Sequence, residues 1–369
     1  MNLFRENILK TSGYVPGEQP LDSATIKLNT NENPYPPSPR VMEAVAAVSA
    51  EQLRRYPSPN GKSFRDAAAQ VHGIPPDWIL PFNGGDELLS VAIRAAAGEH
   101  DAVAYLEPSY SLYPVLTELN GSPAIKLSYK IDDSSSDQIG NRKSGAAPAI
   151  ENPIWQLPFD IEKTPAKILL IVNPNAPSGH LDPIGRLAEI AAGFKGLLVI
   201  DEAYVDFAPA SALELVKKFN NVLLLRTMSK GYSLAGLRFG YGIAQPTLMR
   251  QLEKVRDSYP VDAISIAAAT AAIQDQPYAR STWEKVKTER TRVSIALRQM
   301  GFQLPDSHTN FVLATVPPKV TGRGVYESLK SRGILIRWWD LPRIADKVRI
   351  TIGTPEQSNR LLTEVKKLI

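Results

Sequence analysis

The sequence predicts an α/β fold in which a mostly parallel sheet lies between helices, followed by a smaller α+β domain. Four short apolar runs rich in Leu, Val and Ile predict the strands. In the last three of these runs, polar and apolar residues do not alternate, as they would in a half-buried strand. Helical patterns separate these runs, and strand–helix alternation is typical of a parallel sheet covered on both faces. The predicted strands are Ala102–Leu106, Ile168–Val172, Leu197–Ile200 and Val222–Leu225.

The length of 369 residues predicts about two domains. The first ~35 residues are rich in Pro and Asn and predict an extended arm. Helical patterns follow at Val41–Leu53 and at Ser63–Val71, where Ser63 is a candidate N-cap. Near Pro260 a long helical stretch, Ala263–Gln299, begins. We therefore expect an arm at 1–35 that packs with the small domain, a large domain at 36–260 and a small domain at 261–369.

The small domain is expected to contain two strands, in NFVLATV and KVRITIG, and a helix in VYESLKSR. One polar segment of the large domain, Asp132–Asn152, is poor in apolar residues and predicts a mobile surface loop. A functional lid is the alternative for that segment. The N-terminus carries charges where a signal peptide would be apolar, so we expect a cytoplasmic protein.

Composition excludes several classes of function. The chain is 43% hydrophobic and 22% charged, and no apolar run approaches the ~20 residues of a membrane span. It has no cysteine, which excludes disulfides, thiolate metal sites and a catalytic thiol. Its four histidines lie far apart, so we expect no metal site. The net charge of +4 comes from scattered Lys and Arg residues, which favours small anionic ligands over nucleic acid.

Polar side chains follow the predicted strands at their carboxyl ends. The sequence Asn173–Gly179 follows one strand, Asp201 and Tyr204 follow the next, and Ser229 and Lys230 follow the last. Ligands of open α/β sheets bind beyond the carboxyl ends of the strands. We therefore expect these side chains to converge on one crevice.

Lys230 needs an explanation, because an ammonium group is costly to desolvate at the end of a buried strand. An amine in a partly apolar, cation-rich site has a lowered pKa and can form a Schiff base with an aldehyde. Asp201 could keep a pyridine nitrogen protonated. The helix start at Gly85, together with Arg238, could hold a phosphate. These features predict a site for pyridoxal phosphate, in which Lys230 is the catalytic base.

Each feature also has an ordinary alternative. Lys230 could be an exposed loop cation, Asp201 could cap a helix, and the glycines before the helix could form a plain turn. The combination of the three favours the cofactor site.

The motifs of the chain resemble those of the fold-type I aminotransferases, the aspartate aminotransferase superfamily. The resemblance covers nearly the whole chain, and the arm and RITIGTPE are most similar to the histidinol-phosphate aminotransferases. It implies a seven-stranded type of sheet in the large domain and pyridoxal 5'-phosphate as the cofactor. The motifs, in order, are LNTNENPYPPSP, YPSPNG, NGGDELL, EPSYSLY, NPNAPSG, DEAY, TMSKGYSLAGLRFGYG and VRITIGTPE.

The resemblance also implies a role for each matching residue. Lys230 matches the Schiff-base lysine and Asp201 the partner of the pyridine nitrogen. Asn175 and Tyr204 match the pair that hydrogen-bonds the phenolic oxygen of the cofactor, and Tyr110 matches the ring stacked on it. The implied phosphate cup and its neighbours are Gly85, Asp86, Glu87, Ser229 and Arg238.

Tyr56 matches a residue that reaches the cofactor phosphate of a neighbouring subunit, so a homodimer with shared active sites is implied. Arg349, in an alternating strand, matches a substrate-binding arginine whose guanidinium suits a carboxylate or a phosphate. Arg337 and Tyr14 match further contacts to a phosphorylated substrate, and Asn33 in the arm is a fourth candidate substrate contact.

The activity that the resemblance implies is ping-pong transamination between histidinol phosphate or imidazole acetol phosphate and glutamate or 2-oxoglutarate, in histidine biosynthesis. Alternatives with the same fold are a threonine-phosphate decarboxylase and an aromatic or broad-specificity aminotransferase. A regulatory pyridoxal-binding domain is a further alternative, and the absence of GxGxxG after a strand argues against a dehydrogenase. The chain departs from the usual pattern at Ala176 and Ser178, where Asn and Thr are usual, and at Trp338–Arg343.

Overall fold

A computed structural model describes residues 3–20, 22, 24–132 and 154–369. Its large domain contains a seven-stranded sheet in the order β2-β10-β9-β8-β7-β3-β4. Neighbouring strands are parallel except at β10, which runs antiparallel to both β2 and β9. The strands are β2 (Ile79–Phe82), β3 (Val103–Glu107), β4 (Ala124–Ser128), β7 (Ile168–Val172), β8 (Leu197–Asp201), β9 (Val222–Thr227) and β10 (Gly240–Ile243).

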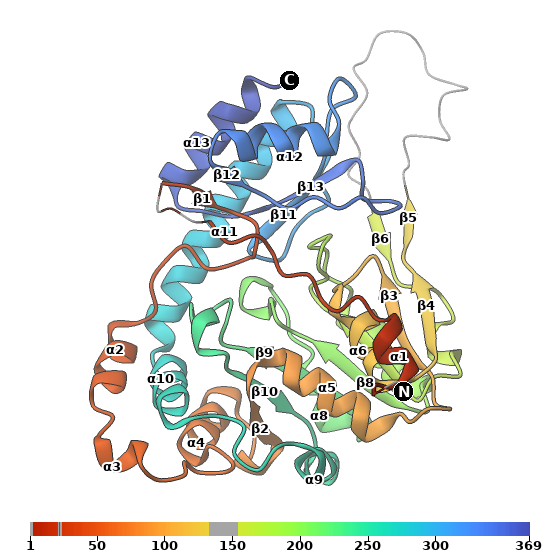
Figure 1. Cartoon of the computed structure of the whole chain (residues 1–369), viewed down its shortest axis with the longest axis vertical. Coiled ribbons are helices and arrows are strands. Elements are labelled where there is room, and N and C mark those ends of the chain that lie inside the picture. Colours follow the sequence, from red (N-terminus) through yellow and green to blue (C-terminus); the bar gives the residue numbers. More distant parts are fainter. Residues whose placement is uncertain (1–2, 21, 23, 133–153) are drawn as a thin grey trace.

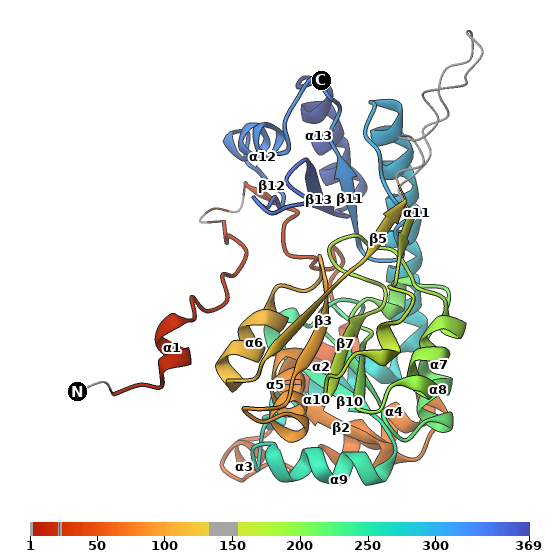
Figure 2. The same ribbon diagram turned by 90° about the vertical axis from the view of Figure 1, so that its right-hand side faces the viewer.

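Helices cover both faces of this sheet, which confirms the predicted fold class (Figure 2). Successive residues of one strand enter different cores: Leu169 packs on one face, and Ile168 and Leu170 pack on the other. Burial on both faces explains why the predicted strands lack a polar alternation. One face is covered by α5 (Gly84–Ala96), α6 (Leu112–Asn120) and α9 (Pro246–Val255), and the other by α4 (Lys62–His72), α7 (Ile184–Gly193), α8 (Leu213–Lys218) and α10 (Ala263–Gln274).

Two predicted helices are interrupted by local caps. The stretch Val41–Leu53 divides into α2 (Pro39–Ala46) and α3 (Ala50–Leu53), because Ser49 and Gln52 form a capping box. The stretch Ala263–Gln299 divides at Asp275, the N-cap of α11 (Gln276–Gln299). Its side chain accepts a hydrogen bond from the backbone nitrogen of Tyr278.

The predicted N-cap at Ser63 is wrong. Helix α4 begins at Lys62, and its N-cap is Gly61 with φ +53°. A left-handed backbone is accessible to glycine at little cost, so the chain turns into the helix there.

The small domain has its own core, built on β11 (Phe311–Thr315), which pairs antiparallel with β13 (Lys347–Thr351). Its other elements are α12 (Gly322–Ser331), β12 (Ile334–Leu335) and α13 (Pro355–Lys366). Helix α11 extends between this domain and the large one (Figure 1). The domain boundaries remain a prediction, and the packing of α10 against α4 and α2 favours a second boundary later than 261.

The arm contacts both domains. Its strand β1 (Ile26–Lys27) pairs with β12, and Leu28 lies in the small-domain core. Near its start, α1 (Glu6–Lys10) lies against α6, where Asn7 donates to the carbonyl of Glu118 at 2.7 Å. The arm therefore links the two domains.

Strands β5 (Lys130–Asp132) and β6 (Ile154–Gln156) pair antiparallel in a separate two-stranded sheet. The predicted loop Asp132–Asn152 lies outside the described residues, apart from Asp132 in β5. In the described ranges, no helix combines the length and apolar character needed to cross a membrane.

Candidate active site

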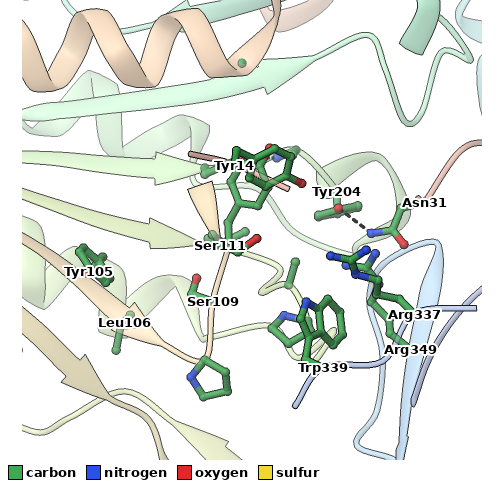
Figure 3. A pocket seen from close by; sticks show the side chains of 18 of the residues that line it. Tyr14, Asn31, Tyr105, Leu106, Ser109, Ser111, Tyr204, Arg337, Trp339 and Arg349 are labelled. Atoms are coloured by element: carbon green, nitrogen blue, oxygen red, sulfur yellow. Dashed lines mark hydrogen bonds between the residues drawn. The ribbon is translucent and has the colours of Figure 1, made fainter. Parts of the chain in front are cut away.

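A cavity of about 500 Å³ lies at the carboxyl ends of the central strands. Residues of the large domain, of the arm and of the small domain all line it, and Asn31 of the arm lies beside Arg337 and Arg349 of the small domain (Figure 3). The described residues contain no group of three His, Asp or Glu side chains placed to hold a metal ion. Predicted site residues in the cavity wall are Tyr14, Gly85, Asp86, Tyr110, Asp201, Tyr204, Ser229, Lys230, Arg238, Arg337 and Arg349.

Lys230 lies in the loop after β9 and points into this cavity. Its Nζ donates to the carbonyl oxygen of Thr30 in the arm at 3.0 Å. Burial, and next the nearby guanidinium of Arg349, lower the pKa of Lys230 to about 8. The neutral amine, which is the nucleophilic form, is therefore accessible close to neutral pH.

Asp201 ends β8 and is only 4% exposed. Its Oδ2 accepts from the hydroxyl of Tyr113 at 3.1 Å, and its Oδ1 accepts from the backbone nitrogen of Ala203 at 3.0 Å. No Lys or Arg nitrogen of the described chain forms an ion pair with it, and burial raises its pKa to about 7. A buried carboxyl group that lacks a cation fits the protonated ring nitrogen of pyridoxal phosphate.

The start of α5 forms a cradle around Arg238. A Cβ on Gly84, where φ is +83°, would lie 2.8 Å from Arg238 Nη2, so the helix backbone and the guanidinium approach closely. Arg238 Nη1 donates to Ser229 Oγ at 3.4 Å, and its Nη2 pairs with Asp86 Oδ2 at 3.2 Å. Backbone N–H groups at a helix start, a hydroxyl and a guanidinium together suit a phosphate group.

Two tyrosines line the cavity beside the cradle and the lysine. Tyr110 donates to Asp86 Oδ1 at 3.1 Å, and its ring meets that of Tyr14 edge-on at 6.2 Å. The hydroxyl of Tyr204 accepts from Asn31 Nδ2 at 2.8 Å, so its own hydrogen remains free to donate (Figure 3). Burial is the main cause that raises the pKa of both tyrosines, which keeps them neutral.

Arg337 and Arg349 lie together beside Trp339 on the small-domain side of the cavity (Figure 3). Both guanidinium groups lie over the Trp339 ring, at 5.4 Å and 5.1 Å from its centroid. Arg349 Nη2 donates to the carbonyl of Asn29 at 2.9 Å, and its Nε is buried without a partner in the described chain. Neither arginine forms an ion pair with a described carboxylate, so both are available to an anionic ligand.

Two predicted site residues do not line the cavity, and their side chains are instead hydrogen-bonded to backbone groups. Glu87 accepts from the backbone nitrogen of Asn83 and so caps α5, on which it lies. Asn33 accepts from the backbone nitrogen of Tyr35 at 3.1 Å and donates to the carbonyl of Gly231 at 3.3 Å. It fastens the arm to the loop that carries Lys230.

Two further predicted residues lie outside the cavity wall. Asn175 is fully buried behind Pro108 and Ser109, to which its amide is hydrogen-bonded. Tyr56 is 81% exposed and stacks on Tyr259, with ring centroids 4.4 Å apart.

Sequence reasoning missed three residues that shape the site. Asn31 holds the hydroxyl of Tyr204, Tyr113 holds Asp201, and Trp339 lies between the two arginines and the protein core. Each lies in one of the motifs or departures named from the sequence, but no local sequence pattern predicted which residue it would contact.

Comparisons with known proteins agree with this geometry. A family model described as "Aminotransferase class I and II" matches residues 23–365. The chain is 44% identical to histidinol-phosphate aminotransferase 1 of Trichormus variabilis over 369 residues, which is 100% of this chain and 99% of that one. It is 42% identical to the histidinol-phosphate aminotransferase of Citrifermentans bemidjiense, with coverage of 100% and 99%.

Solved structures agree on the fold. The histidinol-phosphate aminotransferase of Sinorhizobium meliloti in complex with pyridoxal-5'-phosphate matches with a TM-score of 0.83 at 24% identity, covering 100% of this chain and 99% of that one. L-threonine-O-3-phosphate decarboxylase of Porphyromonas gingivalis matches with a TM-score of 0.74 at 20% identity, covering 93% and 99%. At these identities the likeness establishes the fold alone. Because the family model and the full-length relatives agree, the chain belongs to the pyridoxal-phosphate-dependent class I and II aminotransferases, in the branch of the histidinol-phosphate aminotransferases.

Proposed function

We propose that this enzyme transfers an amino group between L-histidinol phosphate and 2-oxoglutarate, and that in biosynthesis it forms histidinol phosphate from imidazole acetol phosphate and glutamate. The observation that carries the proposal is the pair Arg337 and Arg349, two guanidinium groups at the cavity with no carboxylate partner among the described residues. A guanidinium binds a phosphate ester through two parallel hydrogen bonds. The name of the relatives at 42–44% identity supports the same substrate.

Several polar residues of the cavity have a proposed part in the reaction. Pyridoxal phosphate, when bound, supplies an electron sink for the charge that develops at the substrate α-carbon. Lys230 Nζ accepts the proton from that carbon, and its lowered pKa makes the neutral amine accessible. Asp201 would hold a proton at the ring nitrogen of the cofactor, and the Tyr204 hydroxyl, which accepts from Asn31, would be free to donate to its ring oxygen.

The phosphate of the cofactor is proposed to lie at the start of α5. Gly85 lets the start of α5 lie close to β9, because a Cβ there would meet Leu225 Cδ2 at 3.1 Å. Ser229 and Arg238 supply a hydroxyl and a positive charge. Asp86 is bonded to both Arg238 and Tyr110. The Tyr110 ring would pack against the ring of the cofactor.

We also propose that the enzyme is a homodimer in which Tyr56 contributes to the partner's site. Tyr56 is 81% exposed in the isolated chain, although it stacks on Tyr259, and large aromatic side chains are typical of interface contacts. A cytoplasmic location is part of the proposal, because the proposed substrates are charged metabolites that do not cross membranes unaided.

The test is a single-turnover absorbance scan of the enzyme loaded with pyridoxal phosphate. Histidinol phosphate, glutamate, threonine phosphate and phenylalanine are added separately. The proposal expects transfer of the amino group to the cofactor with histidinol phosphate and with glutamate. Release of carbon dioxide from threonine phosphate, with no response to histidinol phosphate, would replace the proposal by a decarboxylase. A response to phenylalanine equal to that of histidinol phosphate would indicate a broad-specificity aminotransferase.

A further inference from the structure

A loop of the small domain, residues 338–346, joins Arg337 to β13 and lines part of the cavity. An isolated antiparallel bridge between Arg337 and Arg349 closes the base of this loop. Arg343 lies midway between these two arginines in the sequence. Because both ends of the loop carry an arginine of the cavity, the contacts of its middle bear on how that pair lies.

Arg343 binds two backbone carbonyl groups of the large domain. Its Nη1 donates to the carbonyl oxygen of Glu107 at 3.3 Å, and its Nη2 donates to the carbonyl oxygen of Tyr129. Glu107 ends β3 and Tyr129 directly follows β4, which is the neighbouring strand of the sheet. A guanidinium presents its N–H groups in a rigid planar fork, so one side chain can hold both carbonyl groups. Arg343 therefore ties the middle of the loop to the ends of two strands of the other domain.

The backbone around Arg343 also indicates that outside contacts hold the loop. Arg343 has a left-handed backbone, with φ +71°, which is strained for a residue with a Cβ. Such a conformation persists only where the surrounding structure imposes it. The next residue, Ile344, is buried in the core cluster on one face of the large sheet. Ile336 and Val348, on either side of the loop, belong instead to the core of the small domain.

We propose that Arg343 is a positioning residue of the substrate site. Its bonds to the large domain hold the loop so that Trp339 lies against the arginine pair at the cavity. The guanidinium groups of Arg337 and Arg349 both lie over the Trp339 ring, and Trp339 packs against the same core cluster that contains Ile344. The effect on substrate binding rests on the proposed function, whereas the hold on the loop can be measured without any substrate.

The first test measures hydrogen–deuterium exchange of the backbone amides of residues 338–346 in the enzyme loaded with pyridoxal phosphate, without substrate. Arg343→Asn is the main variant, because asparagine tolerates a left-handed backbone and is too short to reach both carbonyl groups. Exchange in the loop should become roughly threefold to tenfold faster, and exchange in α12 should not change. Arg343→Lys, whose ammonium group can still donate to a carbonyl, should show a smaller effect. Unchanged exchange of the loop in Arg343→Asn would overturn the proposal.

The second test measures the kinetics of the same variants. Arg343→Asn should raise the KM for histidinol phosphate roughly threefold to tenfold and leave kcat and the affinity for pyridoxal phosphate unchanged. Arg323→Asn, which removes an exposed ion pair with Glu327 on α12, is the control and should alter neither KM nor loop exchange. A raised KM with unchanged loop exchange would mean that Arg343 binds the ligand itself, and faster exchange with an unchanged KM would deny it a part in the site. Either result overturns the proposal.

A double variant tests whether Arg343 acts through Trp339. When Trp339→Leu and Arg343→Asn are combined, the rise in KM should be smaller than the product of the two single effects, because the two changes disturb the same contact. A rise equal to the product would mean that the residues act independently and would contradict the assignment. If the wild-type enzyme does not react with histidinol phosphate, the proposed function fails, and the exchange test still decides whether Arg343 holds the loop.

Discussion

Arg337 and Arg349 face each other across an antiparallel bridge, and each backbone nitrogen donates to the other's carbonyl oxygen, at 3.0 Å and 2.8 Å. Directly opposed residues place their side chains on the same side of a sheet, so two guanidinium groups lie together at the cavity. Like charges in this arrangement are destabilising unless an anion lies between them. The pair is therefore explained by a ligand rather than by the stability of the fold.

The first prediction tests this explanation. In Arg349→Gln, the KM for histidinol phosphate should rise roughly tenfold to a hundredfold, because a charge-assisted hydrogen bond to the phosphate is lost. The variant should still bind pyridoxal phosphate, because Arg349 lies away from the proposed phosphate site at the start of α5. Arg332→Gln, which removes an ion pair with Glu364 elsewhere in the small domain, is the control and should leave KM unchanged. An unchanged KM in Arg349→Gln would remove that arginine from the substrate site.

The adjacent residues Trp338 and Trp339 provide a second, matched comparison. Trp339 supports both guanidinium groups, so Trp339→Leu should raise the KM for the phosphorylated substrate roughly threefold to tenfold. Trp338 instead donates to the carbonyl of Ala345 at 2.7 Å and stacks on Tyr326. Trp338→Leu should lower the melting temperature and leave KM as it was. Equal kinetic effects of the two variants would contradict the assignment.

The third prediction concerns Lys230. Lys230→Ala should still bind pyridoxal phosphate but lose turnover by roughly a thousandfold or more, because the proposed proton acceptor is removed. In the wild-type protein, the rate at which the Lys230 amine bonds to added pyridoxal phosphate should rise with pH. It should level off above about pH 8, where the amine is neutral. Lys217→Ala, on the surface of α8, is the control. Near-normal turnover in Lys230→Ala would refute the role.

Asp201 gives a prediction for stability in the cofactor-free protein. Its folded-state pKa of about 7 lies above the ordinary value of 3.8, so the folded protein holds a proton that the unfolded chain releases. The stability that this proton confers is present at low pH and is lost as the pH rises through about 7. Asp201→Asn cannot ionise. Its stability relative to the wild type should therefore increase between about pH 5 and about pH 8, by up to roughly 3 kcal/mol in urea unfolding. A constant difference would mean that Asp201 is ionised at both pH values.

The fifth prediction tests the shared active site. Lys230→Ala and Tyr56→Ala should each be weakly active at limiting cofactor. When the two variants are unfolded and refolded together, about half of the dimers should be hybrids, and each hybrid should have one intact site. The mixture should therefore have about a quarter of the active sites of the same amount of wild-type dimer. Tyr259→Phe, which keeps a ring against Tyr56, is the control partner for Lys230→Ala. No gain of activity in the mixture would indicate that Tyr56 acts within its own subunit or not at all.

Residues that follow strands directly could be predicted from the sequence. Asp201 ends β8 and Lys230 follows β9, and a parallel sheet brings both strand ends to one edge. Residues in turns and caps were harder. Glu87 lies in the motif of Asp86, and Asn33 lies in the motif of Asn31, yet only the second residue of each pair lines the cavity.

The sequence by itself determined the fold class, the cofactor and the strand-end residues of the site, because burial on both faces and backbone connectivity act locally along the chain. Only the tertiary structure decided which side chains support those residues. Tyr113 reaches Asp201 across 88 positions, and Asn31 reaches Tyr204 across 173. The guanidinium of Arg349 reaches the carbonyl of Asn29 across 320 positions. Such bonds form because folding removes both partners from water, and no local pattern records which buried donor will meet which acceptor.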